Sequence, residues 1–163
     1  MSLLHTLPSR LVSLRTRLQA PAHDTFALAL RLVFGWQFFL TGRGKLAHLE
    51  RTTDFFASLH IPVPGAHALG IGLLECVGGL LLVAGAGTRL FSTLLASTMI
   101  VALATAHRGE IATDGLDGLF AAPPFPYLLA TAFLIVAGPG RLAVDAWLAA
   151  RFGRTCQTTP APR

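Results

Sequence analysis

The sequence predicts an all-α fold: a membrane-embedded four-helix bundle with amphipathic surface helices at the termini. Of the 163 residues, 53% are hydrophobic and only 13% are charged, and the mean hydropathy is +0.60. These values lie outside the range of ordinary soluble domains. Four apolar runs are separated by segments rich in glycine, proline and charge, and a hydrocarbon core of about 30 Å needs about 20 apolar residues in a helix. The predicted spans are residues 24–41, 66–84, 89–106 and the shorter 124–138.

Residues 1–23 form a basic segment ahead of the first span. Apolar residues at helical spacing accompany its arginines, which is typical of an amphipathic helix on an anionic membrane surface. A basic tail without fixed structure is the alternative, and both interpretations stay open. The residues concerned are Arg10, Arg15 and Arg17, with Leu7, Leu11, Leu14 and Leu18. Asp24 is a suitable N-cap for the first span.

The segments between the spans are predicted from their glycine, proline and charged residues. Residues 42–65 are rich in charge and glycine and predict a loop that holds a short helix at about residues 52–59. The sequence GAGT predicts a tight turn after the second span, and residues 111–126 predict another loop. GPG at residues 138–140 ends the fourth span, and residues 141–163 predict a C-terminal amphipathic helix and tail. The spanning domain is therefore residues 24–140.

The distribution of basic residues predicts the orientation in the membrane. Four spans place both termini on one side, and that side carries eight Lys or Arg residues against four on the other. By the positive-inside rule, the termini are cytoplasmic and the membrane is a bacterial-type inner membrane. The net charge of +5 does not indicate nucleic-acid binding, because the basic residues are scattered between apolar runs and accompany no nucleic-acid module. The predicted partners are the lipid bilayer and one or more proteins of a membrane complex.

Arg31 and Glu75 are the only formal charges placed inside the predicted spans. At 1.5 Å per residue they lie about 10 Å and about 13 Å from the cytoplasmic side of their helices. Small residues lie on the same helix faces as these two charges and permit close helix approach. We therefore expect the two helices to pack through these faces with the charges paired. Two interpretations stay open: an ion pair that fixes helix register, and a functional polar pocket. The small residues are Gly35 and Gly42, and Gly72 and Gly79.

Two further residues are candidates for a proton or ligand site. His107 follows the third span, where an imidazole could exchange protons near neutral pH. Gln37 lies within the first span and needs a hydrogen-bond partner, which the polar cluster could provide. A metal site is not predicted, because no histidine pair has a metal-ligand spacing. The weak alternative is a site formed by four histidines near the outer face: His48, His60, His67 and His107.

The order and spacing of several short motifs make the chain similar to the DoxX family of small four-helix membrane proteins. The motifs are GRGKL after the first span, LLECVGGLLLVAGAGTRL, MIVALATAH and GPGRLAVD. The likeness runs from about residue 29 to residue 148. The chain departs from the family pattern at Thr41, where a His is frequent, and at Leu128, where a Glu is frequent.

The resemblance implies a functionally mixed family whose relatives include small subunits of thiosulfate:quinone oxidoreductases and membrane partners in other complexes. The main hypothesis is an inner-membrane subunit of a redox-linked complex that contacts quinone near Arg31, Glu75 and His107, with no covalently bound cofactor. The alternatives are a non-enzymatic scaffold or assembly partner, and a small transporter or metal-handling protein. Whether the chain is itself an enzyme stays open.

Overall fold

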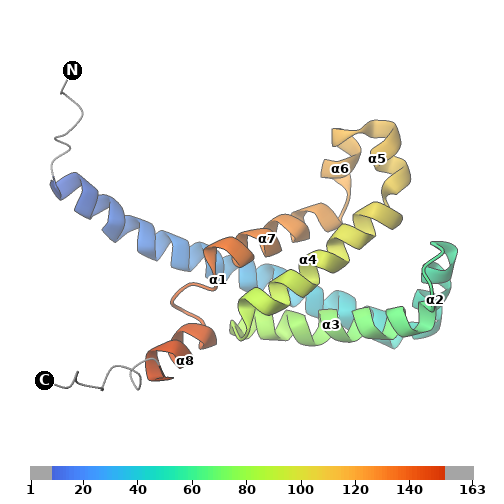
Figure 1. The fold of residues 1–163 in the computed structure, drawn as a ribbon, viewed down its shortest axis with the longest axis horizontal. Coiled ribbons are helices and arrows are strands. Elements are labelled where there is room, and N and C mark those ends of the chain that lie inside the picture. Colours follow the sequence, from blue (N-terminus) through green and yellow to red (C-terminus); the bar gives the residue numbers. More distant parts are fainter. Residues whose placement is uncertain (1–8, 153–163) are drawn as a thin grey trace, which may run out of the picture.

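A computed structural model describes residues 9–152 of the chain, and within this range the only regular elements are helices (Figure 1). The helices are α1 (Ser9–Ala47), α2 (Leu49–Ser58), α3 (Pro64–Ala84), α4 (Thr88–Thr105), α5 (Arg108–Asp114), α6 (Leu116–Ala121), α7 (Pro124–Ala137) and α8 (Val144–Phe152).

Three of these helices are long and apolar enough to cross a membrane: Ala22–Ala47 within α1, then α3 and α4. α7 is a shorter apolar helix of 14 residues. The predicted all-α membrane bundle is thereby confirmed. The second, third and fourth predicted spans agree with α3, α4 and α7 to within two residues at each end.

α1 is longer than the predicted first span at both ends. Residues 9–23 are helical and continuous with the span, so Asp24 is not an N-cap. Its carboxylate instead accepts a hydrogen bond from the backbone N–H of Arg141, 2.8 Å away. The remainder of the expected N-terminal segment, residues 1–8, and most of the expected C-terminal tail, residues 153–163, lie outside the described residues.

At its other end α1 continues to Ala47 through the GRGK sequence, which was wrongly predicted as a loop. The glycine signal is explained by packing rather than by a turn. A Cβ atom added at Gly42 would lie 2.3 Å from the backbone N of Cys76 on α3. Only a glycine fits at this helix contact, so Gly42 belongs inside a helix.

The predicted loop before the fourth span is also wrong, because residues 108–121 form the helices α5 and α6. Gly115, with φ 61°, provides the left-handed turn between them. A Cβ atom at Gly118 would lie 2.5 Å from the Glu110 carbonyl oxygen, so this glycine permits the two helices to pack closely.

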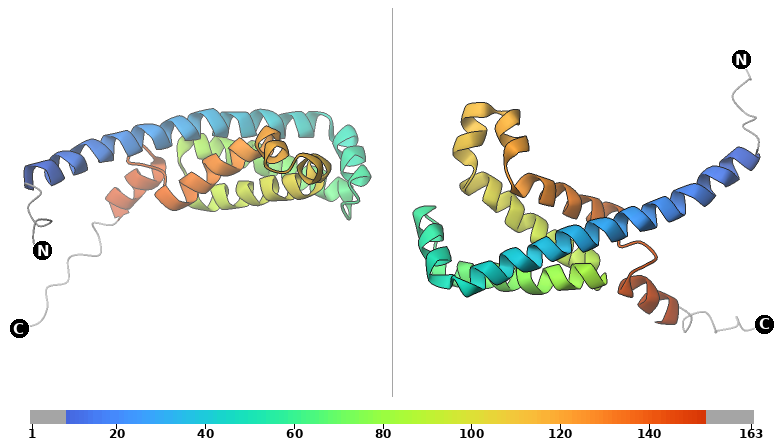
Figure 2. Two further views of the ribbon diagram at one scale, coloured as in Figure 1. Left: turned by 90° about the horizontal axis from the view of Figure 1, so that it is seen from above. Right: turned by 180° about the vertical axis from the view of Figure 1, so that it is seen from behind.

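The long helices form two antiparallel pairs. α1 packs along α3, and α4 packs along α7. The pairs lie close together where α3 turns into α4 and diverge toward the opposite end, where α2 projects from one pair and α5 with α6 from the other (Figures 1 and 2). We call this the α2 end. Residues 138–143 and α8 lie at the other end, which we call the α8 end.

The expected glycine contact between the first two long helices is confirmed. Gly35 of α1 lies against Gly79 of α3, and a Cβ atom at Gly79 would be 2.6 Å from the Gly35 carbonyl oxygen. Gly42 lies against Gly72 in the same way. This register sets which side chains of the two helices lie opposite one another.

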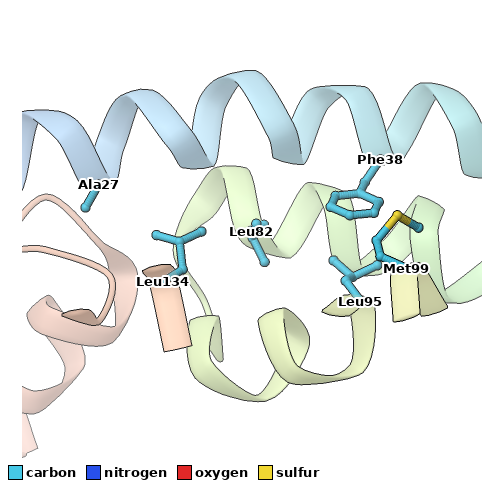
Figure 3. Packing of buried hydrophobic residues seen from close by; sticks show 6 residues of the cluster. All are labelled: Ala27, Phe38, Leu82, Leu95, Met99 and Leu134. Atoms are coloured by element: carbon cyan, nitrogen blue, oxygen red, sulfur yellow. The ribbon is translucent and has the colours of Figure 1, made fainter. Parts of the chain in front are cut away.

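The hydrophobic core lies where all four long helices meet (Figure 3). Phe38 of α1 and Leu82 of α3 point toward Leu95 and Met99 of α4. Ala27 and Leu134 continue the cluster toward the α8 end. Phe38, Leu82, Leu95 and Leu134 are each 1% exposed or less, so this contact holds the two helix pairs together.

Candidate functional site

Arg31 is buried, with 1% of its surface exposed, but its partners are backbone carbonyl groups. Its Nε and Nη2 donate to the carbonyls of Leu82 and Val83 in the last turn of α3, each at 3.0 Å. Its Nη1 donates to Pro139 at 2.8 Å and to Leu142 at 3.1 Å. The guanidinium therefore satisfies carbonyls at a helix C-terminus, where a cation is favoured, and connects α3 to the segment after α7.

Gly85 makes room for this guanidinium. Its φ is 73°, and a Cβ atom there would lie 2.6 Å from Arg31 Cζ. The left-handed φ and the close approach both require glycine.

Asp145 completes the same junction from α8. Its carboxylate accepts hydrogen bonds from the N–H groups of Gly87, at 2.7 Å, and Thr88, at 2.8 Å, at the start of α4. Burial raises the pKa of Asp145, but these hydrogen bonds and the charge of Arg31 outweigh that effect, so the pKa lies below its ordinary value. The carboxylate acts as an N-cap supplied from another helix. This junction is therefore a structural one.

The expected Arg31–Glu75 pair is wrong: Glu75 is bound to Lys45 of α1. The glycine contacts place Arg31 opposite Val83, eight residues from Glu75, which is about 12 Å along a helix. Lys45 lies two turns of α1 farther on than Phe38 and reaches the carboxylate directly, with Nζ hydrogen bonded to Oε2. The Glu75 side chain is 2% exposed and that of Lys45 is 27% exposed.

The Lys45–Glu75 pair faces a cavity of about 280 Å³ between the two diverging helix pairs. Residues of α1, α2, α3, α4 and α7 line it, and most of the surface is aliphatic or aromatic. The aromatic lining residues are Phe38, Phe55, Phe56 and Tyr127. The polar lining residues are Thr41, Lys45, Glu75, Thr98, Thr105, His107 and Tyr127. An apolar cavity with a few convergent polar groups is the usual form of a small-molecule site.

His107, which the sequence indicated as a candidate proton or ligand group, lines the same cavity at the α2 end. Its Nδ1 lies 2.9 Å from Oε2 of Glu110, whose side chain is 63% exposed. The imidazole itself is 22% exposed. His107 thus lies between the cavity that holds Glu75 and the solvent, with an exposed carboxylate beside it.

Gln37 does not lie in this site, because its side chain is exposed on the outer face of α1. The four-histidine metal site is also wrong. Among residues 9–152, no group of three or more His, Cys, Asp or Glu side chains is arranged to hold a metal ion. His107 alone of the four histidines lines the cavity; His48, His60 and His67 are exposed elsewhere.

Sequence reasoning missed Lys45 because the GRGK segment was treated as a loop. The available signal was the seven-residue spacing of Arg31, Phe38 and Lys45, which places them on one stripe of a continuous helix.

Apolar helices of spanning length around a cavity with an ion pair in its wall define the class: a small helical membrane protein with an interior cavity. The family model DoxX matches residues 26–108, just over half of the chain, and the chain belongs to the DoxX family. The matched range contains Arg31, Lys45, Glu75 and His107.

One curated relative comes from Bacillus subtilis (strain 168) and has the name "Putative oxidoreductase CatD". It is 37% identical over 78 residues, which are 48% of this chain and 57% of CatD. The match therefore spans little more than half the length of this relative. No solved structure matches the chain.

Proposed function

We propose that this DoxX-family protein is the inner-membrane subunit of a redox-linked complex and binds a quinone head group beside Lys45 and Glu75. The observation that carries the proposal is the burial of this ion pair in the wall of a largely apolar cavity. Burying two charges is costly and contributes little net stability compared with an apolar pair of the same shape. Ionisable residues inside a membrane are therefore associated with function.

The two charged groups suit the carbonyl oxygen of a quinone and the hydroxyl group of its reduced form. The Lys45 ammonium is a hydrogen-bond donor and suits a ring carbonyl, whereas the Glu75 carboxylate is an acceptor and suits a ring hydroxyl. Oxidation of a hydroquinone releases two electrons and two protons: the electrons would pass to a protein partner, and Glu75 would accept the two ring-hydroxyl protons one after the other. Quinone supplies the redox chemistry, and this chain supplies binding, orientation and proton transfer.

His107 and Glu110 provide a route by which each proton leaves. A histidine side chain can carry a proton between two neighbouring groups through its two ring nitrogens. It lines the cavity on one side and contacts the exposed Glu110 on the other. In this proposal protons are exchanged at the α2 end, and both termini lie on the opposite, cytoplasmic side. The name of CatD as an oxidoreductase supports the redox assignment.

The test is the quinone content of the protein purified with its native partners. We expect Glu75→Gln to lower bound quinone at least fivefold, while Glu50→Gln, the same change at an exposed position of α2, retains the wild-type content. Ala102→Phe, which fills part of the cavity without changing a charge, should also lower it. Extraction followed by mass spectrometry measures the quinone, and the elution volume confirms that each variant is folded. Unchanged quinone in both cavity variants would contradict the proposal.

A non-enzymatic scaffold is the second candidate, favoured by the exposed apolar surface of the C-terminal region. Leu142 is 61% exposed and Trp147 is 57% exposed, and both lie where a partner or the membrane surface could cover them. The same purification separates the two functions. For a scaffold, Glu75→Gln lowers the melting temperature, but the yield of partner is unchanged and no quinone is lost.

A further inference from the structure

A second hollow lies on the other side of α4, away from the quinone cavity. It is an open groove of about 650 Å³ between α4, α5 and the start of α7, and it shares no lining residue with that cavity. Its walls are apolar except for one arginine. The lining residues include Ile100, Leu103, Ala104, Arg108, Ala112 and Leu128.

The groove runs from membrane depth to the membrane surface. Ile100, Leu103 and Ala104 belong to the last turns of a spanning helix that ends at Thr105, and Arg108 is the first residue of α5. Ala104 and Ala112 are small, which leaves the groove wide between its larger aliphatic walls. An apolar groove that ends at a cationic side chain matches one acyl chain of a lipid with an anionic head group.

Arg108 has no acidic partner within the described part of the chain. No carboxylate of residues 9–152 lies within ion-pair distance of its guanidinium, and the neighbouring Glu110 is engaged by His107. Arginine is suited to phosphate because its planar fork can donate two parallel hydrogen bonds. A single arginine at the end of an apolar groove combines a charge that attracts an anionic head group with walls that suit an acyl chain.

We propose that this groove is a binding site for an anionic phospholipid, with one acyl chain along α4 and the phosphate on Arg108. The uncompensated charge of Arg108 favours a lipid over a second copy of the chain as the occupant of the groove. A symmetric contact between two copies would bring the same surface of each together and place two uncompensated Arg108 side chains near one another. This site does not depend on the quinone proposal, since the two hollows have different walls.

The role of the Arg108 charge in lipid selection is tested by native mass spectrometry of the full chain, released from mixed phosphatidylglycerol and phosphatidylcholine bilayers. We expect the wild type to retain phosphatidylglycerol at least threefold over phosphatidylcholine, and Arg108→Gln to reduce that preference to near one. Arg43→Gln removes an exposed arginine of α1 near the α2 end and should leave the preference unchanged. An unchanged preference in Arg108→Gln overturns the proposal, as does an equal loss in Arg43→Gln.

The groove itself is tested by Ala104→Phe, which fills it without altering charge and replaces an exposed side chain, so folding is preserved. We expect retention of the lipid to fall at least threefold although Arg108 is intact. Inorganic phosphate at equal concentration should not displace the lipid, since it lacks a chain; displacement would show a simple phosphate site instead. A changed oligomeric state in Ala104→Phe with unchanged lipid retention would show that a second copy fills the groove.

Discussion

Two cations lie fourteen residues apart on one stripe of α1, and their surroundings give them different roles. The guanidinium of Arg31 is held by four backbone carbonyls, at 2.8–3.1 Å. The N–H donors of this guanidinium are therefore bound to backbone carbonyl oxygens, which take no part in chemistry. Lys45 instead contacts the carboxylate of Glu75 in the wall of the cavity. We therefore assign the assembly of the bundle to Arg31, and the proposed function assigns ligand binding to Lys45 and Glu75.

The assembly role of Arg31 predicts that Arg31→Lys destabilises the protein although the charge is retained. A lysine ammonium has three donors at one atom and cannot reach carbonyls of α3 and of the segment after α7 together. A buried carbonyl left without its hydrogen-bond donor costs about 1–3 kcal/mol. We expect a clear fall in the midpoint of thermal denaturation in detergent, whereas Arg43→Lys, at an exposed position of the same helix, should not change it. A wild-type midpoint for Arg31→Lys would contradict this role.

At the scale of the helices, the contact between α1 and α3 depends on glycines with backbone against backbone. Gly79 has both a carbonyl oxygen and an amide nitrogen of α1 at 2.6 Å from the position of a Cβ atom. Neither of these backbone atoms can move aside without moving the helix. Gly70, on an exposed face of the same helix, has no such neighbour within 4 Å.

These two positions predict opposite results for the same substitution. Gly79→Ala should separate α1 from α3, lower the melting midpoint and weaken the Lys45–Glu75 contact that depends on this register. Gly70→Ala should be neutral or stabilising by up to about 1 kcal/mol, because alanine favours a helix more than glycine does. Thermal denaturation of both variants in one detergent measures the difference. Equal midpoints would show that the helix contact tolerates a methyl group.

Much of this helix arrangement could be predicted from the sequence, because α3, α4 and α7 coincide with uninterrupted apolar runs. The ends of α1 and the helices α5 and α6 could not. Glycine and charge are signals of loops, but in GRGK and around Gly118 the glycines serve close helix contacts instead. A sequence does not distinguish a glycine needed for a turn from one needed for packing.

The same ambiguity decided how much of the site could be predicted. Glu75 is a lone acid in an apolar run, so its burial could be inferred from the sequence. Its partner depends on helix register, and Arg31 lies opposite Val83, about two turns along α3 from Glu75, which leaves the carboxylate to Lys45. His107 could be placed because it follows directly after an apolar run. The exposed position of Gln37 could not be predicted, because no sequence signal indicated which face of α1 it occupies.

At the scale of the whole molecule, the two helix pairs share a core but diverge toward the α2 end, and the cavity occupies the space between them (Figures 1 and 2). α7, with 14 residues, is only about 21 Å long, which is shorter than a hydrocarbon core of about 30 Å. It nevertheless returns the chain to the α8 end, where Arg31 binds Pro139 and Asp145 caps α4. Because α3 and α4 are of spanning length and α7 returns the chain to the α8 end, we expect that α7 is required to complete a fourth crossing.

This requirement predicts which positions share a face of the membrane. In a background with Cys76 and Cys156 replaced by alanine, we expect Glu50→Cys in α2 and Asp114→Cys in α5 to react with a membrane-impermeant maleimide from the same side. Leu148→Cys in α8 should react only from the opposite side, because α8 is hydrogen bonded to the start of α4. With the termini cytoplasmic, intact spheroplasts label the first two and permeabilised cells label all three. Labelling of Leu148→Cys together with Asp114→Cys in intact spheroplasts would mean that α7 does not cross the membrane, and labelling of Leu148→Cys alone would invert the proposed orientation.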